Sequence, residues 1–189
     1  MAHRLRVLIA FVAALTLAAT ASPVLGDEFG TSDGDTGPFA DSAIHEYCWG
    51  PGFDAALKDN ATAAFVNLDA QTDMSDSFLP VCNVTTTDVW WFDADLPGTV
   101  RGQYKCVTWV VFDSICNSSD ITLDPAQINI GDFDQLDTTK SACHEVGHSV
   151  GLTHITGGDD CMMNGQIPNE NAQYQRYNAH HVGHINGRY

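Results

Sequence analysis

The sequence predicts an α+β fold, because helical and strand patterns occupy separate stretches of the chain. Apolar residues recur at helical spacing over residues 56–69. Residues 88–92 and 104–112 are rich in valine and aromatic residues, which favour strands. A second helical segment covers about residues 134–150. The expected order is therefore helix, strands, helix.

Each element has its own signal. The first helix should pack behind a sheet through its apolar positions, which are Ala56, Leu57, Ala61, Ala64, Phe65 and Leu68. The turn sequence Leu96-Pro97-Gly98 separates the two strands, and a further short strand is expected over residues 121–123. Asp134 or Asp137 would cap the second helix. A last helix is expected over residues 172–185, with apolar positions at Tyr174, Tyr177, Ala179, Val182 and Ile185.

The most informative stretch is residues 144–154, which read His-Glu-Val-Gly-His-Ser-Val-Gly-Leu-Thr-His. On a helix, His144 and His148 lie one turn apart on the same face, where they can share a metal ion. Gly151 accepts the left-handed backbone conformation that ends many helices. The chain can then turn and bring His154 to the same ion.

The arrangement indicates hydrolytic chemistry. Three protein nitrogens leave the fourth position of a tetrahedral zinc open, which is typical of catalytic rather than structural zinc sites. Glu145 lies about 100° round the helix from His144 and is better placed to hold a water than to bind the ion. It would take a proton from the zinc-activated water and pass it to the leaving amine. Two other readings stay open: histidines that merely pack, and a zinc site that has lost catalysis.

The pattern H-E-x-x-H-x-x-G-x-x-H followed by a methionine resembles the metzincin clan of zinc endopeptidases, over about residues 136–165. The C-x-M form of Cys161-Met162-Met163 makes Met163 the candidate for the methionine that packs beneath the histidines in this clan. The small size is similar to that of minimal secreted members such as snapalysin. Those enzymes have aspartate as third ligand, where this chain has His154.

The resemblance implies a metzincin-like zinc peptidase domain. Its twisted mixed sheet would pack on an N-terminal helix and on the zinc-binding helix, with a small C-terminal subdomain after the methionine turn. In this clan an edge strand lines the cleft and binds the substrate as an added extended strand. Residues 104–112 are the best candidate for that strand.

The N-terminus predicts export. Residues 1–26 have a basic start, an apolar run and small residues, the layout of a signal peptide that is cleaved after Ala21 or Gly26. The apolar run is shorter than the roughly 20 residues that span a bilayer. Residues 27–42 are acidic, rich in glycine and without periodicity, and predict a loose arm or short propeptide. Residues 43–189 would form the peptidase domain.

The cysteines agree with export, since an even number in a secreted chain predicts disulfides. Six cysteines allow 15 pairings, among which the sequence does not choose. The pairs expected here are Cys48 with Cys82, Cys106 with Cys116, and Cys143 with Cys161. The last pair would close the loop that carries His154. Zinc binding by thiolates is a rival use, but no pair has C-x-x-C spacing.

The charge limits the partners. The formal net charge is −16, and it becomes −18 when Arg4 and Arg6 leave with the signal peptide. Such charge favours solubility and argues against binding to nucleic acid or an anionic membrane. It could also favour basic substrates, although a solvated acidic surface explains it as well. We expect a secreted monomer that acts on a protein or peptide.

Further metal sites have weaker signals. Asp33-Gly34-Asp35 and the aspartates at 132, 134 and 137 could bind calcium, but neither cluster matches the D-x-[DN]-x-[DN]-G loop. His180 and His184 are also four residues apart, but the residue after His180 is a histidine, which supplies no general base. We expect this pair to lie on an ordinary helical face, with a second metal site as the alternative. His45 is isolated and receives no role.

The sequence therefore predicts a secreted zinc endopeptidase with His144, His148 and His154 as ligands and Glu145 as general base. One alternative is a secreted zinc-binding interaction module without catalysis, for which Glu145 would have no purpose. Another is a zinc amidase that acts on cell-wall peptides.

Overall fold

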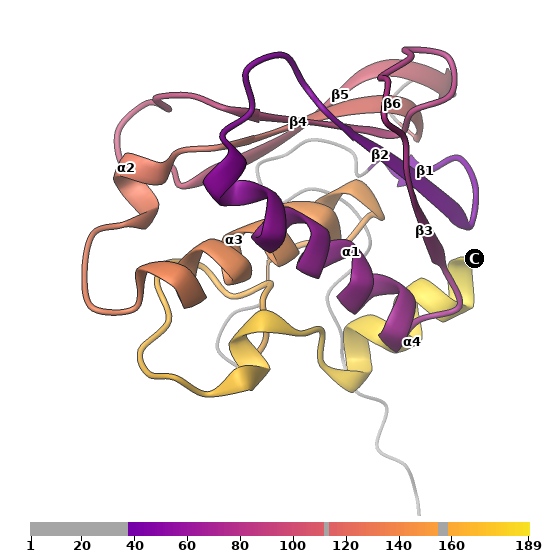
Figure 1. The fold of residues 1–189 in the computed structure, drawn as a ribbon. Coiled ribbons are helices and arrows are strands. Elements are labelled where there is room, and N and C mark those ends of the chain that lie inside the picture. Colours follow the sequence, from indigo (N-terminus) through magenta and orange to yellow (C-terminus); the bar gives the residue numbers. More distant parts are fainter. Residues whose placement is uncertain (1–37, 112–113, 155–158) are drawn as a thin grey trace, which may run out of the picture.

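A six-stranded, mostly parallel sheet forms one layer of the molecule, and helices cover one of its faces (Figure 1). The computed structural model describes residues 38–111, 114–154 and 159–189. The architecture is α+β, as predicted. The predicted signal segment and residues 27–37 of the predicted arm lie outside the described residues.

The sheet has the order β1-β6-β4-β2-β3, with every neighbouring pair parallel. The sixth strand, β5, lies off this path and pairs antiparallel with β6, so the sheet is mixed. Among the described strands, β5 pairs with β6 alone and therefore has one open edge. The strands are β1 (Phe39–Ala40), β2 (Ile44–Trp49), β3 (Ser75–Phe78), β4 (Val89–Asp93), β5 (Gly102–Val111) and β6 (Ile115–Leu123).

The helices α1 and α3 lie side by side beneath the sheet, and the C-terminal segment lies beneath them (Figure 1). The 3₁₀ turn η1 leads into α1, and a short helix, α2, precedes α3. The elements are η1 (Ala55–Leu57), α1 (Lys58–Gln71), α2 (Pro125–Ile128), α3 (Asp134–Ser149), the 3₁₀ turn η2 (Ala172–Gln175) and α4 (Ala179–Arg188).

The core lies between α1 and the sheet, as the periodicity of the first helix predicts. Phe65 of α1 is fully buried, stacks on Tyr47 of β2 at a ring distance of 4.1 Å and meets the edge of Trp91 of β4 at 6.1 Å. Such aromatic contacts add to the stability that burial of apolar area provides. The other predicted apolar positions that the structure buries are Leu57, Ala61, Ala64 and Leu68.

The strands differ most from the prediction. Phe39–Ala40, assigned by the sequence to the arm, form β1 and pair with β6. The strand predicted over residues 121–123 is the end of β6, which starts at Ile115. Residues 117–120 of this strand are polar, and the buried Ser119 has a hydrogen-bond partner because its hydroxyl donates to the carbonyl of Asp88 at 2.7 Å. β2 and β3 were not predicted.

The predicted C-terminal helix over residues 172–185 is wrong in its continuity, because it is broken at residues 176–178 into η2 and α4. The Asn178 side chain accepts hydrogen bonds from the backbone N–H groups of His180 and His181, at 2.9 and 3.0 Å. This is an N-cap, so a new helix begins there.

The structure pairs the cysteines as expected. Cα–Cα separations are 5.4 Å for Cys48–Cys82 and 5.8 Å for both Cys106–Cys116 and Cys143–Cys161. Three disulfides are compatible with an extracellular protein. Within the described ranges, no helix is long and apolar enough to cross a membrane.

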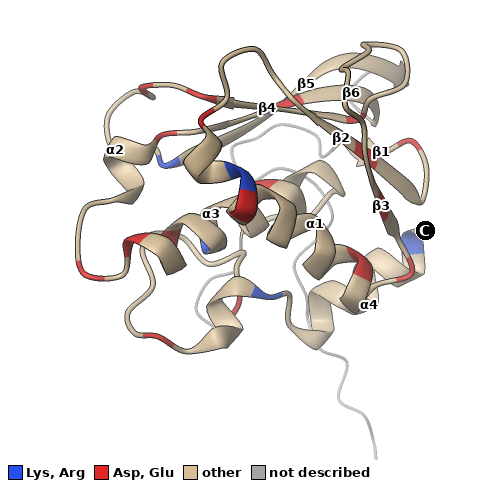
Figure 2. Ribbon diagram, viewed as in Figure 1, with Lys and Arg blue, Asp and Glu red and all other residues tan. Residues whose placement is uncertain are grey.

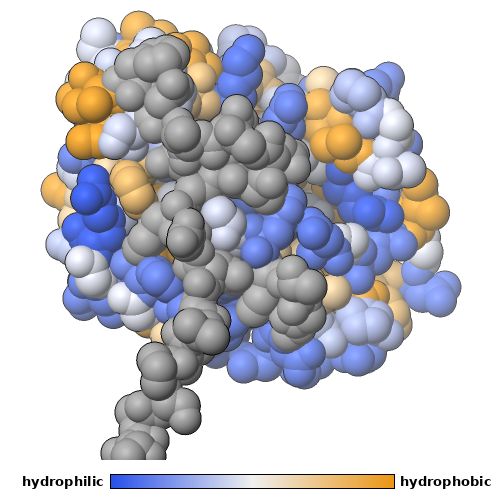
Figure 3. Space-filling model, turned by 180° about the vertical axis from the view of Figure 1, so that it is seen from behind, coloured by the Kyte–Doolittle hydropathy of each residue, from blue (hydrophilic) through white to orange (hydrophobic). Residues whose placement is uncertain are grey.

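Acidic residues outnumber basic ones, 24 to 8, and Figure 2 shows Asp and Glu positions spread along the ribbon with few Lys and Arg positions between them. Exposed valines gather towards the end of the β5–β6 hairpin, where Val107, Val110 and Val111 are exposed. A hydrophobic patch is visible at that corner, at the upper left of Figure 3.

Candidate metal centre

Helix α3 presents three of the predicted site residues from one buried segment. His144, Glu145 and His148 are at most 8% exposed. The two imidazoles lie one above the other, with ring centroids 4.7 Å apart and ring planes nearly perpendicular. The spacing of four residues therefore has the consequence that the sequence predicts.

The start of α3 corrects the predicted cap. The N-cap is Phe133, without a side-chain hydrogen bond, and both Asp134 and Asp137 lie in the first turn of the helix. Asp137 is buried and uses one carboxylate oxygen to accept the backbone N–H of Ile167 at 2.8 Å. The acidic first turn still complements the helix dipole.

The end of α3 follows the prediction. Gly151 has φ = 97°, in the left-handed region that favours glycine. Its N–H donates to the carbonyl of His148, and the N–H of Leu152 donates to that of Gly147. These two bonds form a Schellman motif, which ends the helix and reverses the chain. The reversal is what carries His154 back to the helix.

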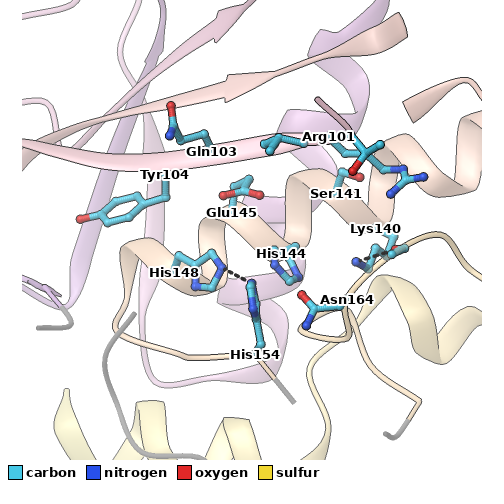
Figure 4. A pocket seen from close by; sticks show the side chains of 14 residues that line it. Arg101, Gln103, Tyr104, Lys140, Ser141, His144, Glu145, His148, His154 and Asn164 are labelled. Atoms are coloured by element: carbon cyan, nitrogen blue, oxygen red, sulfur yellow. Dashed lines mark hydrogen bonds between the residues drawn. The ribbon is translucent and has the colours of Figure 1, made fainter. Parts of the chain in front are cut away.

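The three histidines converge, as Figure 4 shows. The ring of His154 lies 4.7 Å from that of His144 and 4.9 Å from that of His148, centroid to centroid. One ligand atom from each of the three lies within 4.8 Å of the others. Among the described residues this is the one group of three such side chains that could hold a metal ion.

Backbone carbonyls orient two of the rings. Nδ1 of His144 donates to the carbonyl of Cys161 at 2.7 Å, and Nδ1 of His148 donates to that of Leu152 at 2.8 Å. A carbonyl oxygen can only accept, so both Nδ1 atoms carry the proton and both Nε2 atoms present lone pairs. This is the outer-shell arrangement that metal-binding histidines commonly have.

The spacing fits a small tetrahedral ion. Nε2 of His148 and Nε2 of His154 are 3.1 Å apart. Two imidazole nitrogens at zinc bond lengths of about 2.0–2.1 Å and a tetrahedral angle would be separated by about 3.3 Å. Burial and the neighbouring Lys140 ammonium also hold the pKa of His144 well below its usual value, which keeps that ring neutral for metal binding.

Glu145 lies between the histidines and β5 (Figure 4). Its carboxylate accepts a backbone hydrogen bond from Tyr104 and sits against Gly102, where a Cβ atom would be only 2.5 Å from Oε1. Burial raises the pKa of this carboxyl to about 8, against the opposing effects of the Lys140 ammonium and the Tyr104 N–H. Glu145 therefore faces the same cavity as the ligand atoms.

That cavity, of about 340 Å³, lies between β5 and α3. It is lined by residues 99–104 at the start of β5, by α3 side chains including Ser141, by His154, and by Asn164 and Gly165. The metal-binding group thus opens onto a cleft that has the open edge of a strand on one side.

The segment after His154 is fastened to α3 at several points. Lys140 is only 4% exposed, and its ammonium donates to the carbonyls of Met163 and, at 3.1 Å, Gly165. The Cys143–Cys161 disulfide and the Asp137–Ile167 bond flank this contact. Sequence reasoning missed Lys140, although its position four residues before His144 places it on the same helix face.

The methionine that the structure buries against α3 is Met162, whereas the prediction chose Met163. Met162 is fully buried, and a Cβ atom on Gly147 would be 2.3 Å from its sulfur. Met163 is only partly buried. The backbone of Met162 is held because its N–H donates to Asp160, whose carboxylate also pairs with the buried His181. His181 was not predicted to have a role.

The remaining candidates lie apart from the cavity. Nε2 atoms of His180 and His184 are 3.0 Å apart on α4, without a third described ligand side chain. His45 is buried and its Nε2 bonds the Ser149 hydroxyl at the end of α3, at 2.8 Å. Asp33 and Asp35 lie outside the described residues, and the aspartates at 132, 134 and 137 form no metal-binding group.

Comparison with protein-family models and with curated proteins finds no match for this chain. The site itself therefore has to support any functional conclusion.

Proposed function

We propose that this protein is a secreted zinc endopeptidase of the metzincin type. His144, His148 and His154 would bind the ion, and Glu145 would act as general base. The observation that carries the proposal is the convergence of the three imidazoles with the Glu145 carboxylate on one cavity. The intact glutamate distinguishes this arrangement from a binding site that needs only ligands.

The donor set favours zinc. Imidazole nitrogen is a preferred zinc ligand, and three such ligands leave one position for water or substrate. When bound, zinc supplies a Lewis acid that polarises a carbonyl oxygen and makes a water molecule more acidic. The chain itself contributes the orientation of the rings, through the carbonyls of Cys161 and Leu152.

Glu145 would move the proton. Glu145 lines the same cavity as the three histidines, which is where a general base has to lie. Burial raises the pKa of its carboxyl, so the ionised carboxylate is a stronger base than an exposed one. The Tyr104 N–H and the close approach of Gly102 fix the carboxylate in place. It can therefore take a proton from an attacking water and deliver it to the leaving amine.

The open edge of β5 supports a peptide as substrate. An extended peptide can add to such an edge by backbone hydrogen bonds, which leaves side-chain preference to the walls of the cleft. The mixed sheet packed on α1 and α3, the strand beside the histidines and the buried Met162 beneath α3 also support the metzincin assignment. Export is supported by the signal-like residues 1–26 and by the three disulfides.

The test is cleavage of casein by the purified mature protein beside Glu145→Ala, at matched zinc content. We expect activity in the first, none in the second, and zinc in both. Glu170→Ala, which removes an exposed carboxylate, is the control and should keep full activity. His148→Ala should lose both zinc and activity.

Three outcomes would contradict the proposal. Zinc binding without cleavage of casein or any other protein would favour the interaction module. Cleavage of cell-wall peptides alone would favour the amidase. Full activity of His148→Ala would show that the ligand set is wrong.

A further inference from the structure

The cavity has a basic end. Arg101 and Lys140 both line it, on the same side of the histidines, whereas Tyr104 lies on the opposite side (Figure 4). Basic residues are scarce in this chain, which has 8 Lys and Arg against 24 Asp and Glu. Among the described residues that line the cavity, Glu145 is the one carboxylate. A cationic end is therefore unexpected from the acidic composition.

Lys140 is held rigidly at this end. Its side chain is almost fully buried, and its ammonium donates to the carbonyls of Met163 and Gly165. Burial lowers the pKa of Lys140 to about 8, so the group is still mostly protonated at neutral pH. An ammonium has three N–H donors, and two carbonyls leave one for a ligand.

The Arg101 guanidinium has at least one N–H donor without a partner among the described residues. Its Nε is buried and has no hydrogen-bond partner among the described residues. Burial raises the pKa of Asp137 and the positive charge of Arg101 opposes that rise, but the two side chains form no ion pair. One carboxylate oxygen of Asp137 accepts the Ile167 N–H. The backbone at Arg101 is fixed, because its carbonyl accepts the Asp124 N–H at 2.8 Å.

We propose that Arg101, with Lys140 beside it, binds a substrate carboxylate and makes the enzyme prefer an acidic residue next to the bond it cleaves. This inference rests on the proposed peptidase function. A guanidinium is the donor best shaped for a carboxylate, since it can donate two parallel hydrogen bonds. The carboxylate could belong to an Asp or Glu side chain or to the C-terminus of the substrate.

The fold also indicates on which side of the bond the acid lies. Arg101 immediately precedes β5, at the end where that strand begins. Antiparallel pairing is more stable per residue than parallel pairing. A peptide that pairs antiparallel with β5 runs in the opposite direction, so its residues after the scissile bond approach Arg101. The preference should therefore concern the residue that follows the cleaved bond.

The experiment compares peptides that differ only at that position, Asp against Asn, and peptides with a free or an amidated C-terminus there. We expect the Asp peptide to have a kcat/KM roughly 10- to 100-fold above that of the Asn peptide, as for a hydrogen bond to a charged group. Preference for the free C-terminus would identify the terminal carboxylate as the second source. Arg101→Gln should reduce the Asp/Asn ratio to within about threefold, and Arg101→Lys should retain part of it.

Arg176→Gln is the matched control, because it removes one positive charge from an exposed position. It should keep the wild-type ratio. Binding of the same peptides to Glu145→Ala, measured by calorimetry, should show the same acidic preference without cleavage. Equal cleavage of the Asp and Asn peptides by an enzyme that degrades casein would overturn this inference and leave the peptidase function standing. Failure to cleave casein as well would overturn both.

Discussion

Gly102 of β5 lies directly against Glu145 of α3, and substitution of this glycine tests the role of Glu145. A Cβ atom at Gly102 would lie 2.5 Å from Oε1, 2.8 Å from Cγ and 2.9 Å from Cδ of Glu145. Ordinary contact begins at 3.4 Å, so the carboxylate of a Gly102→Ala variant has to withdraw by about 0.9 Å. The three atoms nearest to the added Cβ all belong to Glu145 and none to a histidine.

The expected effect can be worked from that displacement. A catalytic group misplaced by about 1 Å can cost about 100-fold in rate. This corresponds to about 2.7 kcal/mol of transition-state stabilisation, at 1.36 kcal/mol for each factor of ten. Gly102→Ala should therefore lose about 100-fold in kcat/KM and keep its zinc.

The assay is kcat/KM on a fluorogenic peptide, with zinc content and Tm measured on the same samples. Gly183→Ala is the control, since a Cβ atom at this exposed position in α4 meets nothing within 4 Å. It should keep full activity. Wild-type activity of Gly102→Ala would refute the placement of Glu145 as the base, and loss of zinc would show that the strand supports the ligands instead.

Three further predictions follow from the surroundings of the site. Replacement of both Cys143 and Cys161 by serine should lower the free energy of unfolding by about 3 kcal/mol, as expected for a disulfide that closes a loop of this size. Urea titration without reductant measures this change, and an unchanged unfolding midpoint would contradict it. Gly151→Ala should cost about 1–2 kcal/mol because of its positive φ, and should weaken zinc binding in a competition titration, because His154 follows the turn. In metal-free protein, the folded state keeps the Glu145 proton up to about pH 8, whereas the unfolded chain releases it near 4.5, so stability should fall as the pH rises between these values. Glu145→Gln should remove this part of the slope in urea unfolding with a chelator, and parallel curves for the two proteins would count against the raised pKa.

Much of the candidate site could be predicted because its residues are close together in the sequence. The positions of His144 and His148 follow from the helical period alone, and Gly151 follows from the backbone conformation that ends a helix. The buried face of α1 followed from periodicity in the same way. The expected cysteine pairs agree with the structure, although the sequence alone did not distinguish them from the other combinations among the 15 possible.

The parts of the fold that the sequence did not predict have physical explanations. β3 has a polar sequence, Ser75–Phe78, because it is a short edge strand with a single described neighbour. Residues 117–120 of β6 are polar, and the buried Ser119 among them is accommodated because its hydroxyl donates to the carbonyl of Asp88. The break in the C-terminal helix depends on the cap by Asn178. In each case a local hydrogen bond or an exposed edge removes the hydrophobic signal on which the prediction depends.

The sequence by itself determined which residues could bind a metal and on which helix they lie. Only the tertiary structure decided what meets them: Gly102 against Glu145, Arg101 beside Lys140, and Met162 rather than Met163 beneath α3. These contacts join segments that are far apart in the sequence. Helical spacing is a property of neighbouring residues and can be read locally, whereas the packing of a strand or turn against that helix depends on sheet order and on how the whole chain fills its core.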